Sequence, residues 1–297
     1  MTWSAPIWIY LWLAGMAGGA FVAGFLASRF SGQGQKPLLP MATVVGIPLA
    51  VLGVLLLIVD LGRPEWFWHL MTQFKALSPM SMGTWILIAW VMIAFVLVVM
   101  WWLDSRVEEQ VASLMKRLEG LLAAVNALLS VGLISYTGVL LSVSSQSLWA
   151  GTVLLPALFV ASAVSTGVAM LVITALAVNW ATREGSSFRV SGHTVAMLAE
   201  ADAIVILIEL AVLIGFVIWL VISGATDALG VLFTGAMAAP TWIGVVLLAL
   251  LIPLGLDMAA RGKPLEGGVV RTVLMSSFCV IVGGLILRWV ITIGGQM

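Results

Sequence analysis

Several residues that could do acid–base chemistry lie inside a long apolar stretch. The run AMLAEADAIVILIELAVL contains Glu200, Asp202 and Glu209, and His193 precedes it. In a helix, Asp202 and Glu209 share one face, whereas His193 and Glu200 share another. Burying ionisable side chains in an apolar environment is costly, and such groups mark functional sites. We predict that these four residues form a proton relay, with Glu209 as its central member.

The same acids have a structural alternative. Glu200 and Asp202 lie near one end of the stretch, where each could pair with Arg183, Arg189 or a residue of a neighbouring helix. Glu209 lies near the middle of the stretch, away from these arginines. It is therefore the strongest candidate for a functional role.

A second polar set falls at the other ends of the apolar stretches. It contains Asp60, Arg63, Arg288 and the two tyrosines of the chain, Tyr10 and Tyr136. An ion pair between Asp60 and Arg288 is the structural alternative to a role in ligand binding. A buried tyrosine hydroxyl needs a hydrogen-bond partner, so Tyr10 and Tyr136 are candidates to bind the polar edge of an amphiphilic ring.

The elements that position these residues are apolar helices. Of 297 residues, 62% are hydrophobic and 9% are charged, and the mean hydropathy is +1.19. Soluble domains carry about 25% charged residues, so this chain requires lipid as its solvent. About 20 apolar residues cross a bilayer as a helix that satisfies its own backbone hydrogen bonds. The apolar runs lie at 6–28, 39–60, 83–103, 119–141, 152–179, 195–223, 239–257 and 269–292.

The sequence therefore predicts an all-α integral membrane protein of about eight transmembrane helices, in a bacterial or archaeal cytoplasmic membrane. The loops after the first, third, fifth and seventh runs hold ten of the 13 Lys and Arg residues. The positive-inside rule places these loops in the cytoplasm and both termini in the periplasm. We expect contact with membrane lipid and none with nucleic acid.

One connection differs from the others. Residues 61–82 are too polar to span but contain Trp66, Phe67, Trp68 and His69. We predict an interfacial helix there that lies against the membrane. Ten of the 14 tryptophans fall near the outer face, which favours a protein partner or an amphiphilic ligand on that side. A thick aromatic belt explains the same excess equally well.

The chain also shows signs of an internal repeat. The first and fifth runs both contain Pro followed by a cluster of small residues, Pro6 to Gly15 and Pro156 to Ser165. This pattern favours two parallel four-helix halves, 1–145 and 146–297. The small residues allow helices to pack closely.

Cofactors held by this chain alone are constrained by its few ligands. His69 and His193 belong to opposite sides of the membrane, which argues against a bis-histidine haem. The single cysteine, Cys279, cannot hold an iron–sulfur cluster or a structural zinc and is interpreted as a packing residue. We therefore expect no haem and no metal, and any electron transfer requires a bound ligand or a neighbouring subunit.

The order of these features resembles the NrfD/polysulfide-reductase membrane-subunit family. The matching segments are APIWIYLWLAGMAGGAF, DLGRPEWFWHLMTQFKALSPMSMGTW, SYTGVLLSVSSQSLWAGTVLLPALFVASAVSTG and LRWVITIGGQ. The resemblance implies a quinone- or menaquinone-reactive membrane anchor of an oxidoreductase complex. Its partners would be a ferredoxin-like iron–sulfur subunit on the periplasmic face and a molybdopterin catalytic subunit beyond it.

The resemblance also implies where the quinone binds. Carried over by position, the catalytic residues are Tyr136 and Asp60, and alignment through the glycines adds Tyr10 to the binding residues. We further include Arg63, His69 and Arg288 in the binding set, because they fall in the same outer half of the chain. Some family members carry a histidine at the position of Tyr10. Tyr136 would hydrogen-bond a quinone oxygen, and Asp60 would accept a proton.

Two other classes of function remain as alternatives. Buried acids, glycine-rich helices and a repeat also occur in proton-coupled secondary transporters. A transporter, however, gives no reason for a Trp-rich segment on one side. A purely structural anchor without a ligand is the other alternative.

Overall fold

The computed structural model contains only helices and turns among the residues that it describes, which are 4–30, 37–61, 64–66, 68–72, 78–106, 109–143, 148–149, 152–183, 186 and 188–297. Eight helical segments in these ranges are long and apolar enough to cross a membrane. The predicted class, an all-α membrane protein with eight spans, is confirmed.

The spans follow one another in a simple order. They are α1 (Ala5–Phe30), α2 (Leu38–Asp60), α4 (Pro79–Leu103), α5 (Glu109–Ser142), α6 (Leu154–Ala181), α7 (Gly192–Ile222), η4 (Pro240–Leu251) continued by α9 (Ile252–Ala260), and α10 (Gly268–Gly294). The short elements are η2 (Pro64–Trp66), α3 (Trp68–Thr72), η3 (Asp104–Arg106) and α8 (Thr226–Phe233). The seventh span is π-helical over η4 and becomes α-helical near Pro253, which has no N–H to donate.

The helix ends agree with the predicted runs to within a few residues, except at α5. This helix begins at Glu109, ten residues before the predicted run at 119. The additional turns are charged and amphipathic, so hydropathy alone did not include them. Trp101 Nε1 of α4 donates to Glu119 Oε1 at 2.8 Å, which ties this polar end of α5 to its neighbour.

The structure does not show one helix over 61–82, and the position of this segment against the membrane stays a prediction. The described part forms two short elements, η2 and α3, and the next helix starts at Pro79. Trp66 and Trp68 are about half exposed and stack on His69, with ring centroids 4.8 Å and 3.6 Å away. Phe67 lies outside the described residues.

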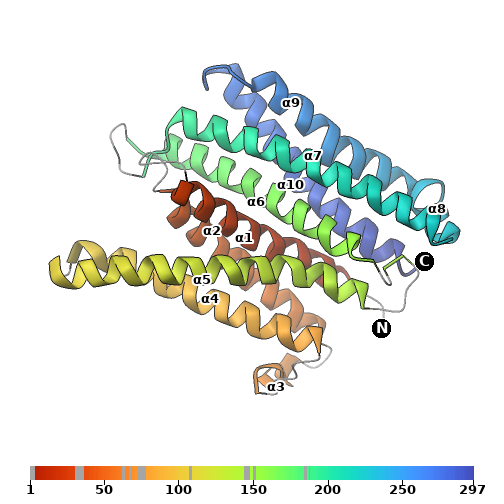
Figure 1. Cartoon of the computed structure of the whole chain (residues 1–297), viewed down its shortest axis with the longest axis horizontal. Helices are drawn as coiled ribbons and strands as arrows, with labels where there is room; N and C mark the ends of the chain where they lie inside the picture. The colour runs from red at the N-terminus through yellow and green to blue at the C-terminus, as the bar shows by residue number, and fades with distance from the viewer. Residues whose placement is uncertain are drawn as a thin grey trace.

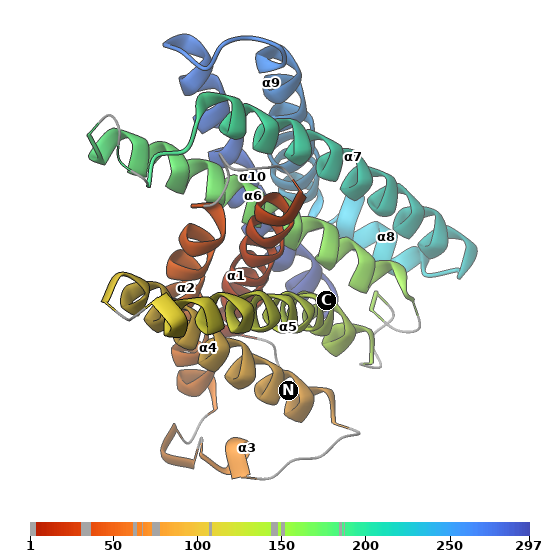
Figure 2. The same ribbon diagram turned by 60° about the vertical axis from the view of Figure 1, so that its left-hand side comes forward.

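The helices form two groups in space (Figures 1 and 2). In the first group, α1 contacts α2 and α5, and α4 contacts α2 and α5. In the second group, α6 contacts α7 and α10, and α9 contacts α7 and α10. The contacts among α1, α2, α4 and α5 therefore correspond to those among α6, α7, α9 and α10, as two parallel halves would require. The repeat itself stays a prediction.

The two groups meet where α1 crosses α6 at backbone distance. A Cβ on Gly19 would lie 1.9 Å from the Ala163 carbonyl oxygen, and a Cβ on Gly167 would lie 2.2 Å from the Ala20 nitrogen. Only hydrogen fits at these positions. The glycine-rich run of α1 therefore serves helix packing, as predicted.

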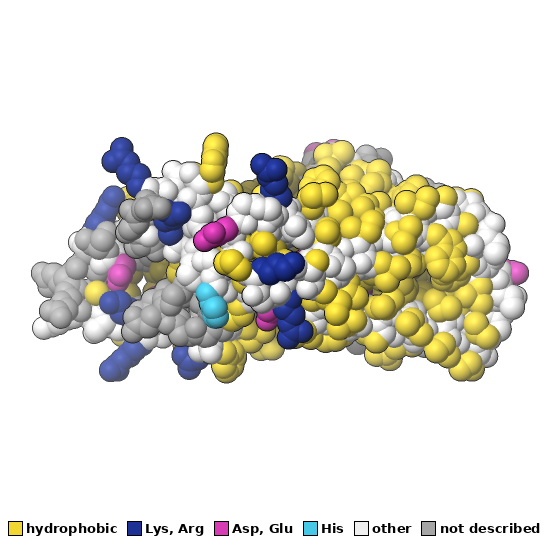
Figure 3. All heavy atoms as spheres, turned by 90° about the horizontal axis from the view of Figure 1, so that it is seen from above, with side chains coloured by type: hydrophobic (Ala, Val, Ile, Leu, Met, Phe, Trp, Pro, Cys, Tyr) yellow, Lys and Arg dark blue, Asp and Glu magenta, His cyan; other side chains and the backbone are white. Residues whose placement is uncertain are grey.

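Charge separates along the bundle. Lys and Arg side chains gather at one end of the molecule, and apolar side chains cover the remainder of the same face (Figure 3). Both chain ends lie at the opposite end of the bundle, and the C-terminus lies near α8 (Figure 1). We call the two ends of the molecule the basic end and the terminal end. The assignment of the basic end to the cytoplasm stays a prediction from the positive-inside rule.

Candidate functional site

A cavity of about 240 Å³ lies between α2 and α4 near the terminal end. Most of its wall is aliphatic, with Val54, Ile58, Leu87 and Val91 among the lining residues, and Tyr10 of α1 forms part of it. Other lining residues, such as Leu55 and Met92, are more than half exposed on the outer surface of their spans. The cavity therefore opens toward lipid. Its volume is slightly below the common range for small-molecule sites, about 300–1,000 Å³.

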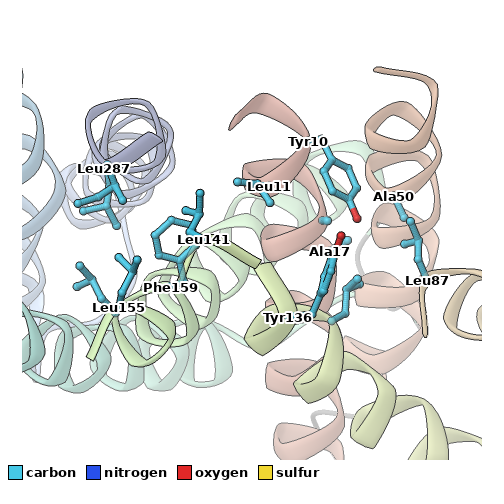
Figure 4. Packing of buried hydrophobic residues seen from close by; sticks show 14 of the residues in the cluster. Tyr10, Leu11, Ala17, Ala50, Leu87, Tyr136, Leu141, Leu155, Phe159 and Leu287 are labelled. Carbon is cyan, nitrogen blue, oxygen red and sulfur yellow. The ribbon is translucent and has the colours of Figure 1, made fainter. Parts of the chain in front are cut away.

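Tyr10 and Tyr136 form a hydrogen-bonded pair at the inner side of this cavity. Their hydroxyl groups point toward each other from α1 and α5 (Figure 4) and share a side-chain hydrogen bond. Tyr10 is 2% exposed and Tyr136 is 8% exposed. Tyr10 reaches the cavity wall, and Tyr136 lies behind it. The sequence analysis predicted Tyr136 as the main residue in contact with the ligand. In the structure, Tyr10 lines the cavity and Tyr136 does not.

Two glycines make room for the tyrosine rings. A Cβ on Gly83 of α4 would lie 2.1–2.5 Å from ring atoms of Tyr136, and a Cβ on Gly53 of α2 would lie 3.0 Å from the ring of Tyr10. Four helices therefore determine where the tyrosine pair lies: α1 and α5 carry it, and α2 and α4 provide the space. Sequence reasoning missed Gly83, because it lies at the start of an ordinary apolar run.

The remaining predicted binding residues divide into three cases. Asp60 ends α2, next to the lining residue Leu61, and accepts a hydrogen bond from the Ser4 hydroxyl. His69 lies in α3 and contacts Trp66 and Trp68, and it does not line the cavity. Arg63 lies outside the described residues.

Arg288 belongs to a different cluster. It is fully buried on α10, and its Nη1 donates to Ser162 Oγ and to the Gly284 carbonyl oxygen, each at 3.0 Å. Glu209 of α7 hydrogen-bonds to the same Ser162 hydroxyl and interacts electrostatically with Arg288. Arg288 therefore interacts with Glu209 and not with Asp60, which was the ion pair considered from the sequence.

Asp202 and Asp257 extend this cluster toward the basic end. Asp202 is 3% exposed and its Oδ1 accepts from Ser165 Oγ at 2.7 Å. Asp257 of α9 is 5% exposed, lies beside Ser276 and interacts electrostatically with Asp202. The Ser276 hydroxyl donates to the Pro253 carbonyl oxygen at 3.3 Å. Sequence reasoning missed Asp257, because it is the last residue of its predicted run and resembled a helix end.

The other two predicted relay residues lie at the surface. The Glu200 side chain is 43% exposed and pairs with Arg261, with Oε1 3.7 Å from Nε. His193 is exposed at the start of α7. Glu200 therefore forms a surface ion pair, which was the structural alternative to a relay. Asp202 and Glu209 share one buried face, as the helical spacing predicted.

No group of three or more His, Cys, Asp or Glu side chains within the described ranges could hold a metal ion. A bundle of eight apolar helices with a lipid-facing cavity and a buried ionisable cluster defines a multi-pass membrane protein. Similarity to known proteins places the chain more closely within that class.

The family model of NrfD, the polysulphide reductase family, matches residues 1–297. The chain is 29% identical to the C subunit of the polysulfide reductase of Wolinella succinogenes over 311 residues, which cover 100% of this chain and 95% of the relative. It is also 29% identical to the protein NrfD of Escherichia coli over 319 residues, which cover 100% and 96%. The chain belongs to the NrfD/polysulphide reductase family and is a multi-pass protein of the bacterial inner membrane.

Proposed function

We propose that this chain is the quinone- or menaquinone-reactive membrane subunit of an oxidoreductase complex and exchanges electrons with a periplasmic iron–sulfur subunit. The family relationship supports the coarse part of this function, a membrane subunit of such a complex. The observation that carries the quinone site is the cavity between α2 and α4, with the hydrogen-bonded pair of Tyr10 and Tyr136 at its inner side.

The residues present fit such a ligand. A quinone is an apolar ring system with two polar oxygens, and the cavity offers aliphatic walls with a tyrosine hydroxyl pair at one side. Because the cavity opens toward lipid, a lipid-soluble ligand reaches it without crossing water. Tyr10 would contact a ring oxygen, and Tyr136 would hold the Tyr10 hydroxyl in place.

The chemistry requires a proton acceptor near the mouth of the cavity. Oxidation of a quinol releases two electrons and two protons, and the electrons pass to the partner subunit. Asp60, at the end of α2 beside Leu61, is the carboxyl group closest in sequence to the lining residues and is the proposed acceptor. Quinone reduction would use the same groups in reverse.

Filling the cavity tests this function. Val91→Trp places an indole in the cavity from α4, and the purified complex should lose most bound quinone and at least about 90% of quinone-linked turnover. Val96→Trp is the matched control, because Val96 lies on the same helix, 41% exposed and outside the cavity lining. Equal quinone content in both variants would show that the ligand binds elsewhere.

Removing one hydroxyl tests the tyrosine pair. Tyr136→Phe should lower quinone-linked turnover roughly 10- to 100-fold while the complex assembles normally. Thr137→Val removes the neighbouring hydroxyl, which donates to the Ile134 carbonyl oxygen at 2.7 Å within its own helix. This control should retain turnover, and unchanged turnover in Tyr136→Phe would remove the pair from the site.

A further inference from the structure

The buried acids of the second helix group form a series that starts at the surface of the basic end. A narrow groove there is lined by Glu200, Asp257, Arg261 and Lys263, together with small residues such as Ala196 and Ala199. Asp257 lines this groove and is also 5% exposed, so it stands between the surface and the interior. Its Oδ2 atom is buried and has no hydrogen-bond partner.

The series continues inward from Asp257. Asp202 interacts electrostatically with both Asp257 and Glu209. On α7 it follows Ala199, which lines the groove together with Asp257, and precedes Glu209. Glu209 follows Asp202 by seven residues on α7, a rise of about 10 Å along the helix axis. Serine hydroxyls accompany each acid: Ser276 beside Asp257, Ser165 beside Asp202 and Ser162 beside Glu209.

The inner end of the series is Arg288. Its Nε and Nη2 atoms are buried without a hydrogen-bond partner, although a guanidinium group has five N–H donors to satisfy. Buried polar groups that lack protein partners are the usual positions of internal water. Asp257 Oδ2 at one end and Arg288 Nε and Nη2 at the other therefore mark two places along the series where water would complete the hydrogen bonding.

Arg288 also contacts the helix that carries the quinone-site tyrosine. A Cβ on Gly15 of α1 would lie 3.0 Å from Arg288 Nη2. Gly15 follows Tyr10 by five residues, a rise of about 7.5 Å along α1. The buried arginine thus lies against α1 about 1.4 turns from Tyr10, on another side of that helix.

We propose that Asp257, Asp202, Glu209 and Arg288 line a water-containing proton path from the basic end of the bundle to the middle of the membrane, with Asp257 as its entrance. Each carboxyl group accepts a proton on one oxygen and releases a proton from the other, so only O–H bonds form and break. Glu200 and Arg261 form the mouth, and His193 is not a member. The path rests on the proposed function in one respect: quinone chemistry is the process that consumes or supplies its protons.

Water access along the path can be measured without any turnover. In a Cys279→Ala background, Asp202→Cys should be modified by silver ions added at the basic end, as judged by protection from later alkylation. Ile204→Cys is the control on the same helix, because Ile204 is 60% exposed but faces the apolar surface. Lipid excludes the ion, so Ile204→Cys should remain unmodified although it is far more exposed.

A second cysteine variant keeps the test valid if Asp202→Cys does not fold. Ser165→Cys places a smaller change beside Asp202 and should show the same modification from the basic end. If neither Asp202→Cys nor Ser165→Cys reacts, or if both react only from the terminal end, the path as proposed does not exist.

Proton uptake then tests the entrance. In vesicles that contain the whole complex, Asp257→Asn should lower proton exchange at the basic end during quinone-linked turnover by roughly 100-fold, whereas Glu266→Gln, an exposed acid of the following loop, should leave it unchanged. Asp257→Asn should retain its bound quinone, which distinguishes it from cavity variants. Full proton exchange in Asp257→Asn with normal quinone turnover would overturn the path alone. Absence of quinone-linked turnover in the unmodified complex would instead overturn the proposed function.

Discussion

The two helix groups solve the same packing problem with different interiors. The first group, α1 to α5, contains an aliphatic cavity and a neutral pair of tyrosine hydroxyls. The second group, α6 to α10, buries Asp202, Glu209, Asp257 and Arg288 instead. An apolar cavity suits a lipid-soluble ring, and a series of hydrogen-bonded ionisable groups suits proton transfer. The comparison teaches that a common arrangement of four helices can accommodate either kind of site.

The largest effect is expected where the two groups meet. Gly19→Val would place side-chain carbon inside the Ala163 peptide group, and backbone atoms cannot move aside as a flexible side chain can. We expect a loss of stability of about 3 kcal/mol or more, seen as little or no assembled protein on size exclusion in detergent.

Gly255→Ala is the control for this substitution. A Cβ on Gly255 meets no atom within 4 Å, although the residue also lies in a transmembrane helix. This variant should assemble at the level of the unmodified protein. Normal assembly of Gly19→Val would show that the groups are not joined by this crossing.

The ionic character of the second group is tested by removing one charge and then both. Glu209→Gln leaves Arg288 buried without its counter-charge and should cost about 3 kcal/mol, measured from thermal unfolding in detergent. Glu209→Gln combined with Arg288→Gln removes both charges and should be less destabilised than the sum of the single variants. Additive losses would show that the two residues are not partners.

The neutral character of the first group is tested at the seat of the tyrosine pair. Gly83→Ala should displace the Tyr136 ring and lower quinone-linked turnover roughly 10- to 100-fold, because small misplacements at a reacting centre are costly. Gly132→Ala on α5 is the control, since its nearest neighbour would be 3.6 Å away. If both variants turn over normally, the ring position does not matter to the reaction.

The smallest effect is expected at the mouth of the proposed path. Glu200→Gln removes an exposed ion pair with Arg261, and such pairs contribute about 0–1 kcal/mol. Thermal unfolding should change little, and raised salt should reduce even that difference. A loss as large as that of Glu209→Gln would mean that Glu200 is a buried member of the series after all.

The fold could be predicted from the sequence because each span is a continuous apolar run. Hydropathy placed the eight helices, and helical spacing correctly put Asp202 and Glu209 on one buried face. Two features could not be predicted from the sequence, for physical reasons. Asp257 ends its run and gave no sign of facing inward, and the partner of Arg288 depends on how α7 and α10 are rotated against each other.

The tyrosine pair shows a similar limit. The sequence selected Tyr10 and Tyr136 because they are the two tyrosines of the chain and lie in matching segments. Their mutual hydrogen bond, and the space that Gly83 leaves for one ring, require three helices to be placed together. Stacking of Trp66 and Trp68 on His69 likewise arises from turns that no periodic pattern describes.

The opening of the cavity between α2 and α4 has a consequence for enzymology. A ligand that enters sideways from the bilayer is sampled at its mole fraction among the lipids, whatever the volume of buffer around the vesicles. The apparent KM for a hydrophobic quinone should therefore stay constant per mole of lipid and appear to rise when lipid is added at a fixed amount of quinone. Dilution with empty bilayer would act as a competitive inhibitor.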